Sequence, residues 1–266
     1  TWTQLSSGPS KRRRASMAYD PVREQVWLFG GRRGATFFND LWVGALGPTG
    51  DIAWTPAGST MPDFPFVRSD ASLVFEPVGD QLILFGGRPD SSLLASSAQP
   101  VANDLWAYRI DPDPLSGEWH SLAANQPTAS VASLDGTHIG RARGGAANIA
   151  TVDSTLVVFG GTTQGLGFRE VDASEPPRLI AGNGMDLLDL KPYQDHDLPP
   201  PPIAPWSFKI TAFLPPAREH QAWASDGPGK QLFVFGGESL GVTLNDTLVY
   251  DLGFGAEDGF WKLVVP

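Results

Sequence analysis

Two short stretches of this sequence contain residue types that could do chemistry. The first is GESLG at Gly237–Gly241, which matches the Gly-x-Ser-x-Gly pattern of a serine nucleophile. That chemistry needs a turn from a strand into a helix and a histidine base further along the chain, and no histidine follows Ser239. An apolar, strand-like run precedes the motif and no helical pattern follows it. We therefore interpret GESLG as a structural feature and expect no catalytic residue there.

The second stretch is DHD at Asp195–Asp197, whose side chains could ligate a metal ion in principle. It adjoins the proline-rich run Leu198–Pro205, and no two histidines of the chain are at ligand spacing. The proline run favours polyproline II, as a ligand for an aromatic groove or as a stiff connector, and we favour the connector. The chain has no cysteine, which excludes thiolate nucleophiles, cysteine-ligated zinc and disulfides. The sequence predicts no metal and no cofactor.

The charge balance points toward protein partners. The chain has 29 acidic and 19 basic residues, a formal charge of −10, which argues against nucleic acid or an anionic membrane as the main partner. A local exception is KRRR at Lys11–Arg14, which could bind phosphate or an acidic partner, or could be a solvated loop. No apolar run approaches the ~20 residues of a membrane span. The lack of cysteine fits a reducing, intracellular location and also an exported protein that needs no disulfide.

Composition and pattern indicate an all-β protein. Glycine, proline and tryptophan occur 30, 24 and 9 times among 266 residues, and only 18% of the residues are charged. This mixture is typical of many short strands joined by turns, with large aromatic side chains between sheets. Apolar positions at helical spacing are hard to find.

A motif that occurs four times accounts for most of the chain. In each copy an apolar run such as QVWLF (25–29) is followed by two glycines, and its lack of alternation indicates a strand covered on both faces. A strand and a turn precede the run, while a strand beginning Asn-Asp and a strand with tryptophan follow it, so each copy reads as four antiparallel strands. The third copy departs, with NGMDLLDL (183–190) in place of Asn-Asp. The repeat marks are the glycines Gly30, Gly31, Gly86, Gly87, Gly160, Gly161, Gly236 and Gly237 and the tryptophans Trp54, Trp119, Trp206 and Trp261.

This order of motifs resembles the kelch repeat over nearly the whole chain, as units of about 15–58, 69–124, 142–211 and 217–266. The resemblance implies a β-propeller in which each unit is one four-stranded blade of ~50 residues. The glycine pairs are 56, 74 and 76 residues apart, so we expect insertions, the longest at 162–205. We expect the glycines where positive φ or close backbone approach is needed, and the tryptophans at contacts between blades.

Propellers of this family usually close with six or seven blades, whereas four complete units are visible. TWTQL at Thr1–Leu5 matches the fourth strand of a unit, although the last unit already has its own at Trp261. We therefore expect an orphan strand at 1–5 and an open arc of a six- or seven-bladed propeller. A partner chain or further residues would supply the missing blades. The alternative is an unusual small ring that closes through a displaced strand.

An arginine recurs 16–18 residues before the first glycine of each pair. In kelch adaptor domains, arginines near this place line a pocket that receives acidic peptides. The resemblance thus implies a cationic ring at the channel mouth for a carboxylate or an acidic segment. The alternative, which we favour, is that these arginines belong to the family consensus and bond neighbouring backbone carbonyls. The candidate ring residues are Arg14, Arg68, Arg143 and Arg218, with His220 beside the last.

Three functions are compatible with these features. We expect a non-catalytic protein interaction module or assembly subunit, because no catalytic set converges and long loops on a rigid scaffold are natural contact surfaces. An alternative is a kelch-class epimerase or lyase acting on a small carboxylate or sugar, for which Arg218, Glu219 and His220 are the only qualifying cluster. Another is a structural component of a large complex that packs through residues 162–205.

Overall fold

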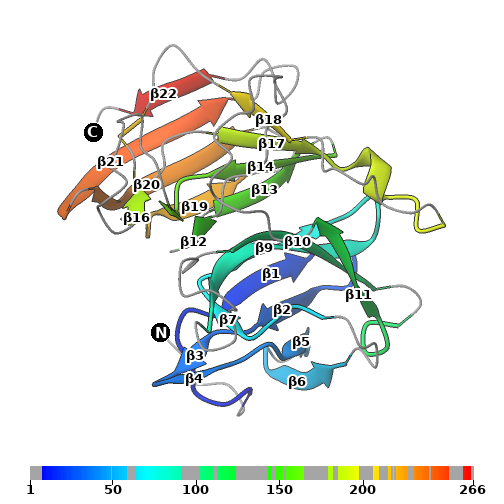
Figure 1. Ribbon diagram of the computed structural model, residues 1–266. Coiled ribbons are helices and arrows are strands. Elements are labelled where there is room, and N and C mark those ends of the chain that lie inside the picture. Colours follow the sequence, from blue (N-terminus) through cyan, green and yellow to red (C-terminus); the bar gives the residue numbers. More distant parts are fainter. Residues whose placement is uncertain are drawn as a thin grey trace.

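A computed structural model gives the structure of the protein (Figure 1). Its described residues are 8–48, 50–58, 64–90, 102–110, 113–123, 143–144, 148–152, 154–164, 179–181, 185–197, 206–209, 215–216, 218, 220–226, 231–239, 241–251 and 260–264. They contain β-strands, one short 3-10 helix, η2 (Lys191–Tyr193), and no α-helix, which confirms the all-β class. No helix among these residues could span a lipid bilayer.

The first two antiparallel sheets come from the N-terminal half of the chain. The first sheet has the order β1-β2-β5-β6, and the second pairs β8-β9-β10-β11, with the short β7 also beside β9. The bounds are β1 (Ser16–Asp20), β2 (Gln25–Phe29), β5 (Leu41–Leu46), β6 (Ile52–Ala57), β7 (Arg68–Ser69), β8 (Ser72–Glu76), β9 (Gln81–Pro89), β10 (Ala102–Arg109) and β11 (Glu118–Ala123).

The third and fourth sheets repeat this arrangement, with strand orders β13-β14-β17-β18 and β19-β20-β21-β22. Two small sheets, β3-β4 and β12-β15-β16, lie beside the main ones. The bounds are β3 (Arg32–Arg33), β4 (Thr36–Phe37), β12 (Arg143–Gly144), β13 (Asn148–Val152), β14 (Thr155–Phe159), β15 (Thr162–Gln164), β16 (Leu179–Ala181), β17 (Met185–Asp189), β18 (Trp206–Lys209), β19 (Ala222–Ser225), β20 (Gln231–Ser239), β21 (Val242–Asp251) and β22 (Phe260–Val264).

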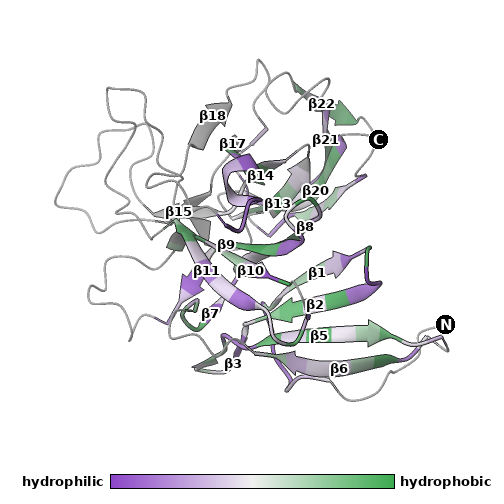
Figure 2. Ribbon diagram, turned by 90° about the vertical axis from the view of Figure 1, so that its right-hand side faces the viewer, coloured by the Kyte–Doolittle hydropathy of each residue, from purple (hydrophilic) through white to green (hydrophobic). Residues whose placement is uncertain are grey.

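The four sheets stack in chain order, and the apolar core between each pair of neighbours follows one rule (Figures 1 and 2). We call the side of a sheet that carries the residues one and three positions before its glycine pair the forward face, and the opposite side the rear face. In each of three core clusters, the forward face of one sheet packs on the rear face of the next. The forward-face residues are Trp27, Phe29, Ile83, Phe85, Val157 and Phe159, and the rear-face residues that meet them are Leu82, Leu84, Leu156, Val158, Leu232 and Val234.

Burial of these side chains stabilises the stack, because each fully buried aliphatic or aromatic side chain contributes roughly 1.5–3 kcal/mol. None of the three clusters joins the first sheet to the fourth, so no closed ring is seen in the described part of the chain. The orphan strand expected at 1–5 lies outside the described residues, as does most of the insertion at 162–205.

The glycine pairs take the backbone conformation that their recurrence indicates. All eight glycines have positive φ, between +60° and +99°. At Gly30 the close approach is also visible, since a Cβ there would lie 2.8 Å from the carbonyl oxygen of Arg68. The pair does not always end a strand: β9 and β20 continue through it, with a shift in register at the glycines, as at a β-bulge.

Two of the four repeat tryptophans lie at contacts between sheets. Trp119 in β11 packs edge-on against Phe29 of the first sheet, with ring centroids 5.5 Å apart. Trp261 in β22 lies against Phe159 of the third sheet at 4.6 Å. Trp54 lies on the rear face of the first sheet, since it pairs with Gly44, and the side chain of Trp206 is outside the described part of the structure.

Candidate functional site

The arginine before the second glycine pair is buried and bound to an aspartate of its own unit. Arg68 donates from Nη1 to Oδ1 of Asp104 at 2.6 Å and from Nη2 to Oδ2 at 2.7 Å. It also donates to the carbonyls of Gly86, at 2.9 Å, and Phe66, at 3.1 Å. Four of its five N–H groups therefore have acceptors within the unit. The indole of Trp106 completes the set by donating to Oδ2 of Asp104 at 2.8 Å.

The fourth unit repeats this geometry almost atom for atom. Arg218 donates to Oδ1 and Oδ2 of Asp246 at 2.7 and 2.8 Å, to the carbonyl of Gly236 at 3.0 Å, and to that of Pro216 at 3.2 Å. Its side chain is fully buried. The hydrogen bond from Arg218 is the largest cause that lowers the pKa of Asp246, so the carboxylate stays charged in the pair.

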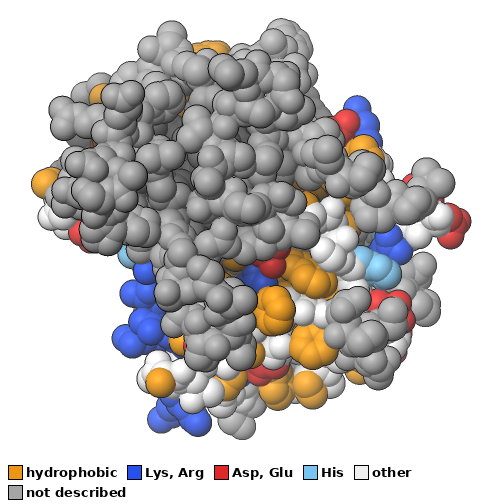
Figure 3. Space-filling view, viewed as in Figure 1, with side chains coloured by type: hydrophobic (Ala, Val, Ile, Leu, Met, Phe, Trp, Pro, Cys, Tyr) orange, Lys and Arg blue, Asp and Glu red, His pale blue; other side chains and the backbone are white. Residues whose placement is uncertain are grey.

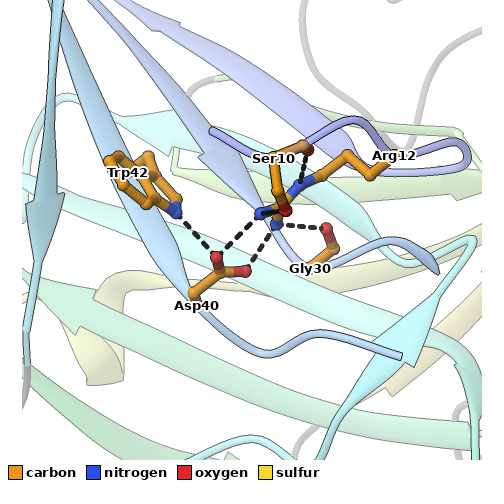
Figure 4. A network of polar contacts seen from close by, with 5 residues as sticks. All are labelled: Ser10, Arg12, Gly30, Asp40 and Trp42. Carbon is orange, nitrogen blue, oxygen red and sulfur yellow. Dashed lines mark hydrogen bonds and ion pairs between the residues drawn. The ribbon is translucent and has the colours of Figure 1, made fainter. Parts of the chain in front are cut away.

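In the first unit the equivalent residue is Arg12 rather than Arg14 (Figure 4). Arg12 donates to Oδ1 and Oδ2 of Asp40 at 2.5 and 2.9 Å, and to the carbonyl of Gly30 at 3.0 Å. Trp42 donates its indole N–H to Oδ2 of Asp40 at 2.7 Å. Burial, the largest single influence, raises the pKa of Asp40, but the hydrogen bonds from Arg12 and Trp42 together with the positive charge lower it overall.

The spacing that identifies these pairs is constant. Arg12, Arg68 and Arg218 each lie 18 residues before the first glycine, whereas Arg14 lies 16 before it. Each aspartate is the second residue of the Asn-Asp motif. The structure thus pairs the recurring arginine with the recurring aspartate of the same unit. The constant spacing of 18 residues, together with the aspartate of the Asn-Asp motif, is the sequence signal that could have predicted these ion pairs.

The third unit differs. Arg143 pairs with Thr163, the second residue after the glycine pair, just as Arg68 pairs with Pro89. Arg143 therefore occupies the register position of Arg68, although it lies 17 residues before the first glycine of its pair and Arg68 lies 18 before. Met185 pairs with Phe159, and the residue that precedes it in the sequence, where the other units have aspartate, is Gly184. The side chain of Arg143 lies outside the described part of the structure.

Arg14 belongs to a different set, two residues after the buried arginines. Arg14, Asp70 and His220 all have positive φ, between +57° and +58°. Arg14 and Asp70 come together from neighbouring units: the amide of Asp70 donates to the carbonyl of Arg14 at 3.0 Å, and Nη1 of Arg14 lies 3.2 Å from Oδ2 of Asp70. His220 is exposed, and the corresponding residue of the third unit is Gly145 by sequence.

Around Arg12 and Arg14 lie several cations that are not paired with an acidic side chain of the described residues. The backbones of Arg13 and Arg32 exchange two hydrogen bonds of 2.9 Å, which places their side chains next to each other. We call these two residues and the neighbouring cations Lys11 and Arg33 the basic surface; Arg33 follows Arg32 in β3, so its side chain projects from the other side of the strand. Across the residues that the structure describes, no acidic side chain is paired with any of these four. Lys and Arg side chains gather on this side of the molecule (Figure 3).

A second polar cluster lies where β10 and β11 meet the segment after η2. Nη1 of Arg109 donates to the carbonyl of His196 at 3.1 Å, and Nε2 of His120 lies 3.8 Å from Oε2 of Glu118. Burial and then the charge of Arg109 lower the pKa of His120. No group of three His, Asp or Glu side chains in the described ranges could hold a metal ion. His138 lies outside those ranges.

The GESLG motif forms part of a β-hairpin. Ser239 ends β20 and pairs with Val242 at the start of β21, and Gly241 in the turn has φ of +81°. The motif therefore lacks the strand-turn-helix context that a serine nucleophile of this type requires.

A comparison of the chain with models of protein families finds no match, and neither does a search of curated proteins.

Proposed function

We propose that the protein is a non-catalytic interaction module of the kelch propeller type, which binds an acidic segment of a protein partner. The observation that carries the proposal is the basic surface of Lys11, Arg13, Arg32 and Arg33 on a chain of formal charge −10. The propeller architecture is supported by the four stacked, four-stranded antiparallel units and by the repeat motifs in each of them.

The placement of Arg13 opposite Arg32 favours a ligand. Like charges directly opposite each other on paired strands are destabilising, and no acidic side chain of the described residues compensates this pair, so it costs the fold some stability. An added carboxylate relieves the repulsion and can accept two parallel hydrogen bonds from each guanidinium. A flexible acidic segment suits this surface because its successive carboxylates can reach several cations.

The recurring arginines do not serve this purpose in the proposal. The guanidinium groups of Arg12, Arg68 and Arg218 are already bound to aspartates of their own units, so a second carboxylate would have to displace the first. Because Arg218 is bound to Asp246, its guanidinium is not available to a substrate of the epimerase or lyase considered above. Glu219 lies outside the described residues. No specific observation favours that second function.

The test is binding of a fluorescent peptide that contains a run of glutamate and aspartate, followed by fluorescence anisotropy. We expect binding that weakens as salt is raised, and at least a tenfold loss of affinity in the double variant Arg13→Glu, Arg32→Glu. Lys191→Glu is the control, because Lys191 is an exposed cation on η2 that forms no side-chain ion pair with another described residue. Equal losses in both variants would contradict the proposal, and so would tighter binding of double-stranded DNA than of the peptide.

A further inference from the structure

The fourth sheet exposes the residues that its predecessors bury. The last residue before the glycine pair is phenylalanine in all four units: Phe29, Phe85 and Phe159 are at most 1% exposed, whereas Phe235 is 55% exposed. Two positions earlier, Phe233 is 37% exposed, while its three counterparts are fully buried. Both lie on the forward face of the fourth sheet, and none of the three core clusters includes them.

The first sheet exposes apolar side chains on its opposite face, and none of the three core clusters covers that face. Its rear face carries Val26 and Leu28 in β2, which pair with Tyr19 and Met17 of β1. Met17 and Tyr19 are 57% and 52% exposed, and neither belongs to a core cluster. Trp54 lies on the same face and is half-buried, with the backbone of Gly8 close to one edge of its ring.

These two faces are the matching halves of one contact. At two of the internal contacts, the phenylalanine of a forward face meets the tryptophan of the next rear face: Phe29 meets Trp119, and Phe159 meets Trp261. The exposed Phe235 and the half-buried Trp54 are the corresponding phenylalanine and tryptophan at the two ends of the stack. In the described part of the chain, the rear face of the first sheet is the one that no forward face covers.

We infer that the forward face of the fourth sheet binds the rear face of the first sheet in a second copy of this chain. Two such contacts, related by a two-fold axis, join a pair of copies and cover all four end faces. The closed pair then contains eight stacked sheets, within the range of four to eight blades in which propellers close. The inference rests on sheet stacking alone and does not depend on binding of an acidic segment, so either proposal can fail without the other.

The oligomeric state tests this inference. Sedimentation velocity of the full chain should give twice the chain mass at micromolar concentration, and Phe235→Asp should weaken association at least tenfold. Val78→Asp is the matched control, because Val78 is as exposed as any apolar residue described but lies in the turn between β8 and β9. A monomer at all concentrations would overturn the inference, and so would an open-ended series of larger species.

Disulfide cross-linking then identifies the faces in contact, and because the sequence contains no cysteine, only the introduced cysteines can form a disulfide. Between the first two sheets β1 packs against β8. Ala224 stands at the register position of Ala18 in β1, and Met17 at that of Leu73 in β8, so Ala224 of one copy should face Met17 of the other. A mixture of Ala224→Cys and Met17→Cys chains should form a covalent dimer on mild oxidation, whereas either variant alone should not. If a chain carrying both substitutions instead forms an internal disulfide and stays monomeric, the two faces meet within one chain and the inference is wrong.

Discussion

Arg68 and Asp104 meet end-on, through Nη1 and Nη2 of the guanidinium, with both nitrogen–oxygen distances at 2.6–2.7 Å and both side chains buried. The same guanidinium bonds the carbonyl of Gly86, so one side chain ties the entry of its unit to the second and third strands of the main sheet. Arg12 and Arg218 repeat the arrangement. We therefore regard the pair as the polar element that fixes the first, second and fourth units, in addition to the apolar contacts between sheets.

Neutralising the acid of this pair should destabilise the protein in proportion to its burial. Removal of one partner of a buried ion pair leaves an uncompensated charge and costs about 3–5 kcal/mol. We expect Asp104→Asn to approach that range in urea denaturation. Asp40→Asn should cost clearly less, because the Asp40 side chain is 35% exposed and that of Asp104 is 8% exposed. Equal costs for the two variants would show that burial does not set the strength of the pair.

The glycine pairs allow steric contact to be separated from backbone conformation. Gly30→Ala should lower the free energy of unfolding by more than Gly34→Ala, although both glycines have φ near +60°. A Cβ at Gly30 would lie 2.8 Å from the carbonyl oxygen of Arg68, whereas a Cβ at Gly34 has no neighbour within 4 Å. The Gly34 variant should cost about 1 kcal/mol from the left-handed conformation alone. Thermal and urea unfolding of the two variants measure the difference, and similar values would argue against the close approach.

Acid should weaken the pairs in the first and fourth units. The folded-state pKa values of Asp40 and Asp246 lie below the ordinary value of 3.8, so the folded protein takes up these protons less readily than the unfolded chain. Their contribution to stability is therefore complete above about pH 4 and is lost as the pH falls through the lowered pKa values. We expect Asp246→Asn to flatten the pH dependence of unfolding below pH 4, compared with the exposed control Asp226→Asn. An unchanged slope would contradict this assignment.

Tyr108 should titrate late in alkali. Burial raises its pKa to about 12, and its hydroxyl donates to the carbonyl of Pro114 at 3.0 Å. Because the folded state favours the neutral phenol, stability from this residue is complete below pH 10 and declines as the pH rises toward 12. Absorbance titration should therefore lose one late-ionising tyrosine in Tyr108→Phe, while Tyr193, also raised to about 12, should remain. A normal titration of every tyrosine in the unaltered protein would overturn the prediction.

The recurrence of strand motifs predicts the fold class and the strand order within each unit. Apolar runs, turns and glycine pairs act locally, so strands such as Gln25–Phe29 and Thr155–Phe159 have the predicted bounds. Positive φ at the glycine pairs was predicted from the residue type, because φ is a local property of the backbone. The sequence pattern could not show that β9 and β20 continue through their glycines, because that depends on pairing with a later strand.

The candidate site shows the other limit. The sequence contains the recurring arginines and the Asn-Asp motifs, but the choice of Arg12 over Arg14 depends on which side chain reaches Asp40, 28 residues further along the chain. KRRR alone does not show which arginine is buried, because side chains alternate along a strand-like segment and Arg12 and Arg14 therefore fall on the same side. In the folded protein Arg12 binds the carboxylate of Asp40, whereas Arg13 is exposed and lies opposite Arg32.

The amino-acid sequence by itself thus determined the all-β class, the four-fold repeat and the position of the glycines, since each follows from local pattern and backbone sterics. Only the tertiary structure decided which faces of the sheets are covered and which charges are neutralised. Phe159 and Phe235 stand at the same position of the repeat, yet one is buried and the other exposed, because burial depends on whether another sheet lies against that face.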